Sequence, residues 1–213
     1  MFLAGGLSDV INMHFRTYVR VYVLAILIFI IGVVFGSLAI RILTPAQKTE
    51  LAQYLTGFCR SFGSVSPVTR AVTARDSFAG NIKTLLIAWL LGLSVIGAPL
   101  ILVIIFMRGF MMGFTVGFFV SELMVKGVLF SLAAVFPHSI IAVPAIIIGC
   151  TGGMVFASSL VRDHFSSGRV GLRALFATLT AFVVSTVTLI LVAALVEAYI
   201  TPVFIAVATK YLL

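Results

Sequence analysis

Uncharged apolar residues fill four long stretches of the chain, at residues 22–40, 84–107, 139–161 and 174–196. About 20 apolar residues in a helix cross the ~30 Å hydrocarbon core of a bilayer. A helix satisfies its own backbone groups in lipid, whereas the strands of a membrane barrel alternate apolar and polar residues. These runs are apolar on every face, so the pattern predicts an all-α, polytopic membrane helix bundle. The run at 84–107 is expected to bend at Pro99.

Shorter apolar segments add to these spans. After Arg108, residues 110–120 predict a further short span. Residues 128–135 are too short to cross, and the break at Pro137 followed by a returning helix predicts a re-entrant element. Such a backbone survives in lipid only when it packs on protein or lines a wet cavity. We expect about five spans plus this re-entrant segment, in a single membrane domain covering residues 1–213.

Two polar segments show helical periodicity. In residues 7–22, apolar residues recur every three or four positions, and polar and basic residues fall on the other side. This pattern predicts an N-terminal interfacial helix lying in the membrane plane. Residues 42–82 predict a pair of short amphipathic helices, the first of them opened by Thr44, with Gln47 three residues later as in a capping box. The second is expected to begin at Pro67.

Orientation determines which segments lie outside the membrane. We expect a cytoplasmic N-terminus, although a simple count of basic residues in the loops does not favour it. The segment 42–82 is then an extracytoplasmic helical loop. Its aromatic residues Tyr54, Phe58 and Phe62 are the candidates for outward docking of a partner.

Composition narrows the class of function. Of the 213 residues, 62% are hydrophobic and 9% are charged, against ~25% charged residues in soluble domains. The net charge is +8, but the basic residues lie at helix ends and connections without forming a tract. They favour contact with anionic membrane lipid over nucleic acid. The HExxH, GxSxG and phosphate-loop motifs are absent, so we expect no enzyme, metal or cofactor.

Glycines recur four residues apart in three series: Gly32 and Gly36; Gly109, Gly113 and Gly117; and Gly149 and Gly153. This spacing places each series on one helix face and allows close approach of a second helix. Packing within the monomer is favoured over homodimerisation, and a glycine-lined pore face is a third interpretation.

Three polar residues lie close to the apolar runs. Arg108 is interpreted as part of a tight turn between helices, from which its side chain reaches the interface. Glu197 is interpreted as a solvated residue at the end of the last span, with pairing to Lys83 as an alternative. His138 follows Pro137, where it either acts in a proton-linked switch or satisfies backbone groups freed by the proline.

Five sequence blocks resemble the stage II sporulation protein M family: SFAGNIK at 77–83, WLLGLSVIGAP at 89–99, RGFMMGFTVGF at 108–118, FPHSIIAVPA at 136–145 and EAYITPV at 197–203. The resemblance implies a role in engulfment during endospore formation, at the sporulation septum or the engulfing membrane of the mother cell. It also implies a non-catalytic anchor for peptidoglycan hydrolases, the stage II sporulation proteins D and P. No catalytic residue transfers. The motif positions carried over are Asn81, Pro99, Pro137, His138, Pro144, Glu197 and Pro202, with the glycines of the second series.

Two other classes of function remain open. A kinked span and an outward hairpin are also typical of the membrane half of some export transporters. The small number of charges within the spans argues against solute coupling. A continuous polar cavity between the helices would favour transport, whereas a dry bundle would favour a scaffold. An intramembrane enzyme is a distant third, suggested only by His138 beside the Ser139 hydroxyl.

Overall fold

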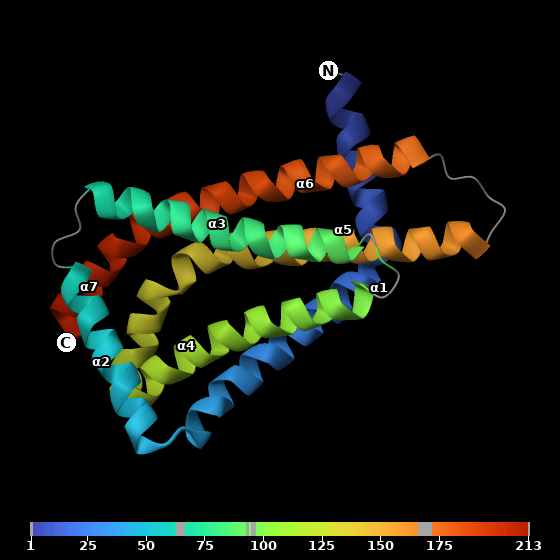
Figure 1. The fold of residues 1–213 in the computed structure, drawn as a ribbon. Coiled ribbons are helices and arrows are strands. Elements are labelled where there is room, and N and C mark those ends of the chain that lie inside the picture. The colour runs from blue at the N-terminus through green and yellow to red at the C-terminus, as the bar shows by residue number, and fades with distance from the viewer. Residues whose placement is uncertain (1, 63–66, 93, 95–96, 166–171, 213) are drawn as a thin grey trace.

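The computed structural model describes residues 2–62, 67–92, 94, 97–165 and 172–212, and the side chains of 18–54, 71–92, 94, 97–158, 183–205 and 207. Its elements are α1 (Phe2–Ala39), the 3₁₀ turn η1 (Ile40–Ile42), α2 (Pro45–Phe62), α3 (Pro67–Gly92), α4 (Gly97–Ala134), α5 (Phe136–Phe165), α6 (Leu172–Leu195), the π-helical turn η2 (Val196–Ile200) and α7 (Thr201–Leu212). Figure 1 shows their arrangement. The described residues contain no strand, and the expected all-α fold is confirmed.

Four helical stretches among the described residues are long and apolar enough to cross a bilayer. They are Tyr18–Ile42, Gly97–Ala134, Phe136–Ser158 and Val183–Ile205. Many large apolar side chains on their outer faces are exposed, including Phe35 and Val103 at 58% and 54%. Such a surface is expected for helices in contact with lipid. Helix α3 runs beside these four helices but carries charged residues and is not among the four candidate spans. The expected count of five spans therefore stays a prediction.

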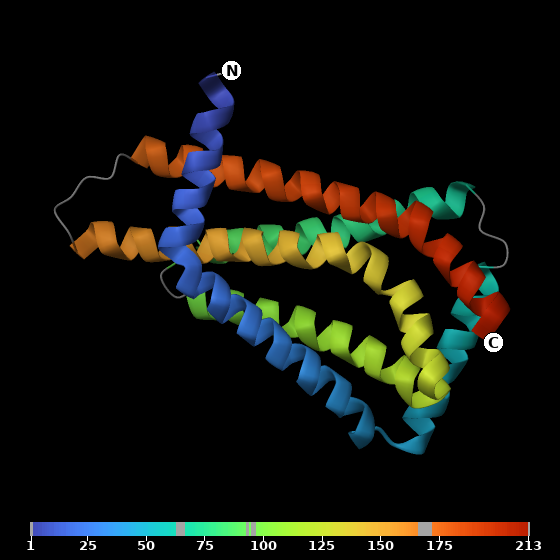
Figure 2. The ribbon, with the colours of Figure 1, turned by 180° about the vertical axis from the view of Figure 1, so that it is seen from behind.

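The long helices lie side by side, and several short elements gather at one end (Figures 1 and 2). We call it the α2 end, because it holds α2, α7 and the junction of α4 with α5. The first part of α1 runs crosswise to α3, α5 and α6. It joins the span at a kink where Tyr18 leaves helical geometry (φ −108°, ψ 16°). Residues 7–22 are therefore helical, and their place in the membrane plane stays a prediction.

The predicted span at 84–107 is wrong. Helix α3 ends at Gly92, and α4 begins at Gly97 and runs back along α3 (Figure 1). The second amphipathic helix of the 42–82 segment is likewise longer than expected, because α3 continues from Pro67 to Gly92. Pro99 lies in the first turn of α4, where its missing N–H costs no hydrogen bond, so it does not bend a span.

Two other expected breaks, after Arg108 and at Glu197, also differ from the structure. No break follows Arg108, since α4 runs without interruption from Gly97 until Met124 leaves helical geometry. Helix α5 continues through Pro144, which is exposed. The final span does not end at Glu197, because η2 leads directly into α7 with Pro202 in its first turn. Pro137 also lies in the first turn of its helix, α5.

The expected short helix before the Pro137 break is present as residues 125–134, between Met124 and Val135. It turns away from the rest of α4 at the α2 end (Figure 1). Phe130 is fully buried and packs with Phe118, Phe119 and Ile205, which ties this short helix to α4 and α7. The helix–break–helix order thus agrees with the re-entrant prediction, while its depth in a membrane stays untested.

Met124 makes the sharp turn with φ 51° and ψ −127°, a conformation that glycine adopts far more readily than other residues. Its side chain is 77% exposed, so little packing would be lost on its removal. We expect Met124→Gly to raise the free energy of unfolding by about 1 kcal/mol, because it relieves backbone strain. Denaturant unfolding in detergent micelles measures this. Leu129→Gly, at a half-exposed helical position of the same segment, should instead cost about 1 kcal/mol. A loss of stability in Met124→Gly would contradict the strained turn.

Helix α2 begins with the predicted capping box. The Thr44 backbone N–H donates to Gln47 Oε1 at 2.9 Å, and the Gln47 N–H donates to Thr44 Oγ1 at 3.4 Å. These reciprocal bonds satisfy two backbone donors that the first turn of a helix leaves unpaired. Leu51 and Ala52 pack against the buried cluster of Ile40 and its neighbours, and α2 also contacts α7. The helix is therefore held to the α2 end by one face.

Candidate functional site

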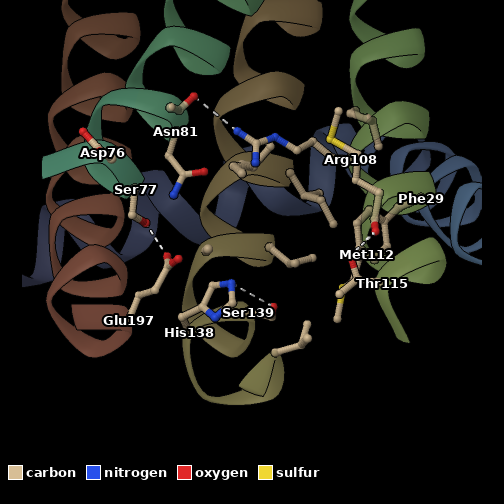
Figure 3. Close-up of a pocket in the computed structure, with 18 residues that line it drawn as sticks. Phe29, Asp76, Ser77, Asn81, Arg108, Met112, Thr115, His138, Ser139 and Glu197 are labelled. Atoms are coloured by element: carbon tan, nitrogen blue, oxygen red, sulfur yellow. Dashed lines mark hydrogen bonds between the residues drawn. The ribbon is translucent and has the colours of Figure 1, made fainter. Parts of the chain in front are cut away.

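A cavity of about 360 Å³ lies between α1, α3, α4, α5 and η2 (Figure 3). Its polar lining comes from elements far apart in the sequence: Asp76, Ser77 and Asn81 of α3, Arg108 and Thr115 of α4, His138 and Ser139 of α5, and Glu197 of η2. Apolar residues, among them Phe29 and Ile105, complete its walls. Clefts and cavities of this size with a few convergent polar groups are the usual form of ligand sites.

Arg108 enters the cavity from the middle of the straight part of α4 and is half-buried. Its Nη2 donates to Thr84 Oγ1 at 2.5 Å and to the Gly80 carbonyl oxygen at 3.3 Å, both on α3. The interpretation of Arg108 as a residue of a turn is therefore wrong. An arginine at mid-span is costly in lipid, and such residues usually line a functional site.

Glu197 faces the cavity from the π-helical turn η2 and accepts a hydrogen bond from Ser77 Oγ (Figure 3). The extra residue in a π turn redirects side chains, and such turns are frequent at functional sites. Lys83, the alternative partner named from the sequence, is exposed and is absent from the cavity lining. Instead, Ser77 ties the carboxylate to α3, while Arg108 interacts with it only through the longer-range electrostatic field.

His138 and Asn81 complete the polar surface between these charges (Figure 3). His138 Nε2 lies 3.5 Å from Ser139 Oγ, and its buried Nδ1 has no hydrogen-bond partner within the described part of the chain. Asn81 is 7% exposed and its amide points into the cavity. Both residues can donate and accept hydrogen bonds, so they can adapt to a polar ligand.

The glycine series lie where helices meet within the monomer. A Cβ on Gly32 or Gly36 would overlap the carbonyl oxygens of Phe106 and Phe110 on α4. Conversely, a Cβ on Gly109 or Gly113 would overlap carbonyl oxygens of α1, and one on Gly117 would lie 2.9 Å from Ser37 Cα. The first two series therefore face each other across the contact of α1 with α4. That contact leaves the backbones too close for any side chain.

The third series faces other helices. A Cβ on Gly149 would overlap the Leu85 side chain of α3 and lie 2.9 Å from Thr186 Cγ2 of α6. One on Gly153 would lie 3.2 Å from the Ala88 carbonyl oxygen of α3. These glycines thus let α5 approach both α3 and α6, which is packing within one molecule.

The candidate docking residues lie on α2, at the end of the bundle. Tyr54 is 72% exposed. The side chains of Phe58 and Phe62 lie outside the described residues. Tyr54 does not line the cavity, so the structure separates this surface candidate on α2 from the polar cluster of the cavity.

A family model described as stage II sporulation protein M matches residues 25–202. The chain belongs to the stage II sporulation protein M family. The match runs from α1 to the first turn of α7 and includes every cavity-lining residue. No curated protein and no solved structure matches the chain. Membership in this family makes the protein a sporulation-related membrane protein.

Within this member of the stage II sporulation protein M family, three motif positions named from the sequence meet in the cavity: Asn81, His138 and Glu197. Sequence reasoning missed that Arg108 and Ser77 join them. Ser77 and Arg108 both lie in the resemblance blocks at 77–83 and 108–118. Their position in these blocks was the one sequence feature that could have identified them. The motif prolines Pro99, Pro144 and Pro202 do not line the cavity.

Proposed function

We propose that this protein is a non-catalytic membrane anchor that recruits and holds peptidoglycan hydrolases, of the class of stage II sporulation proteins D and P, at the septal or engulfing membrane. Family membership supports a sporulation role, and the resemblance supplies the hydrolases as partners. The observation that carries the proposal is α2, a polar helix attached to the bundle by one face with Tyr54 exposed on another. Such a helix offers a surface outside the membrane for a partner.

The arrangement of the short elements supports the same proposal. Helix α2, the short helix at 125–134 and α7 all lie at the α2 end (Figure 1). With the expected cytoplasmic N-terminus this end faces the cell wall, where the hydrolases act. Cysteine accessibility in intact cells at exposed α2 positions, such as Gln53, tests this sidedness, and labelling only after permeabilisation would reverse it.

Tyr54→Ala tests the docking surface directly. We expect it to reduce the amount of hydrolase that co-purifies with the protein from sporulating cells at least fivefold, because an exposed tyrosine is a common energetic centre of an interface. Immunoblotting of the purified complex measures this, with the quantity of membrane protein held equal. The α2 packing residues Leu51 and Ala52 are untouched, so the fold should persist.

Tyr199→Ala is the matched control, because Tyr199 is likewise an exposed tyrosine (52%) but lies on η2 rather than on α2. It should leave co-purification unchanged. Equal capture by the Tyr54 variant and the unaltered protein would remove α2 as the docking surface. Normal hydrolase localisation in cells that lack the protein would overturn the anchoring function itself.

A transport function is the second candidate, and the polar cavity is the observation that favours it. Charged groups inside a membrane bundle commonly mark a solute pathway. The cavity reaches from the middle of α4 towards the α2 end, since Arg108 and Val135 both line it. Co-purification of an ATPase, or solute flux in proteoliposomes that Arg108→Leu abolishes, would support transport over anchoring.

A further inference from the structure

The cavity described above contains charges of opposite sign that do not meet. Arg108 bonds to Thr84 and Gly80, and Glu197 bonds to Ser77, without an ion pair between the two among the described residues. In Figure 3 they enter from different helices on opposite sides of the view. Both side chains are half-buried, and a charge partly removed from water is normally paired because an unpaired charge in a low dielectric is costly.

Both charged groups keep unused hydrogen-bonding capacity. A guanidinium has five N–H donors, and both hydrogen bonds of Arg108 come from Nη2. The Glu197 carboxylate has two acceptor oxygens, and Ser77 donates to Oε2. His138 Nδ1 lacks a partner within the described part of the chain. The cavity therefore offers donors at one side, acceptors at another and an adaptable imidazole between them.

These features define the chemistry of a ligand. A guanidinium fork is suited to a phosphate or carboxylate. Glu197, with Asp76 also in the lining, suits a cationic hydrogen-bond donor. A metal ion is a poor alternative, since no group of three or more His, Cys, Asp or Glu residues in the described chain could hold one. A primary ammonium needs only a few acceptors, which Glu197 and the Asn81 amide oxygen provide.

We propose that the cavity binds a small zwitterion, with its anionic phosphate or carboxylate group against Arg108 and its primary ammonium group against Glu197. The volume of about 360 Å³ lies near the lower limit of ligand pockets, so the bound group is small rather than a glycan strand or a peptide. The apolar lining from Ile105, Met111 and Met112 suits methylene groups. The ligand is either a phosphoethanolamine lipid headgroup or a free zwitterion of that kind.

Thermal unfolding of the delipidated full-length protein in detergent tests the proposal. The additions are a short-chain phosphatidylethanolamine, phosphatidylglycerol with the same chains, and soluble O-phosphoethanolamine. We expect the phosphatidylethanolamine to raise the unfolding midpoint by about 5 °C, and the phosphatidylglycerol to have little effect because it lacks the ammonium group. An equal shift with O-phosphoethanolamine identifies a free zwitterion as the ligand, whereas a shift with the lipid alone identifies the headgroup.

Glu197→Gln removes the anion while keeping the shape of the side chain. It should weaken binding of the effective zwitterion at least tenfold, measured as the ligand retained in native mass spectrometry. Lys83→Gln is the control, because Lys83 is an exposed charge of α3 outside the cavity. Should Glu197→Gln fail to fold, Ser77→Ala replaces it, with an expected loss of about threefold from the released carboxylate.

Three outcomes would overturn the proposal. The first is an equal effect of phosphatidylglycerol and phosphatidylethanolamine, which would indicate a general requirement for lipid. The second is no shift with any addition, which would leave a cavity that holds water only. The third is unaltered binding by folded Glu197→Gln. These outcomes do not bear on hydrolase recruitment, because they are measured on the purified protein.

Discussion

Gly113→Ala should lower the free energy of unfolding by about 3 kcal/mol, because the contact between α1 and α4 has no room for the added methyl group. The added Cβ would overlap the Val33 carbonyl oxygen on α1. Backbone cannot rotate away as a flexible side chain can, so α1 and α4 would have to separate. Denaturant unfolding in detergent micelles measures the loss, and Gly113→Leu should be more severe.

Gly80→Ala provides the matched control, because a Cβ there would meet nothing within 4 Å. It should raise stability slightly, since alanine favours the helix over glycine by about 1 kcal/mol. Equal stability of Gly113→Ala and the unaltered protein would contradict the close packing of α1 on α4. Loss of a dimer with an unchanged unfolding free energy would place this glycine face between subunits instead.

Arg108→Leu is expected to abolish function while leaving the protein folded. Arg108 is half-buried and forms no ion pair with a described residue, so an apolar replacement removes a desolvation cost without leaving a partner charge behind. The local partner is not left unpaired, since Thr84 Oγ1 also donates to the Gly80 carbonyl oxygen at 3.0 Å. We therefore expect the free energy of unfolding to change by less than about 1 kcal/mol and spore yield of the host to fall at least tenfold.

Spore counts and unfolding curves of the same variant separate a functional role of Arg108 in the cavity from a structural role in joining α4 to α3. Arg108→Lys keeps the positive charge but loses the planar fork, so it should restore spore formation only partly. Normal spore yield with Arg108→Leu would show that the cavity is not needed for function. A large loss of stability would instead make Arg108 a structural residue that joins α4 to α3.

The helical class and the capping of α2 followed from local chemistry alone. Apolar run length determines membrane helices, and the Thr44–Gln47 capping box depends on residues three positions apart. The glycine periodicity likewise identified helix faces that approach closely. It could not reveal which helices meet, because the partner of α1 lies beyond α2 and α3 in the sequence.

The errors have a common physical cause. Gly97 and Pro99 predict a bend within one span, but the same residues also suit the start of a helix. Composition does not distinguish a bent span from a hairpin when both sides of the turn are apolar. Arg108, with apolar sequence on both sides, then suits a turn better than a span, because no polar neighbour for it is evident within its own segment. Thr84 and Gly80 supply that neighbour only once α3 and α4 fold back on each other.

The direct backbone contact between α1 and α4 also limits how the chain can be made. Both glycine series lack side chains, so α1 has no large complementary surface until α4 is synthesised. The ribosome must first complete α2 and α3, and during that interval the glycine face of α1 is without its partner helix. The α1–α4 contact can therefore form only after α4 is made, and an insertase that shelters unfinished helices should increase the yield of this protein.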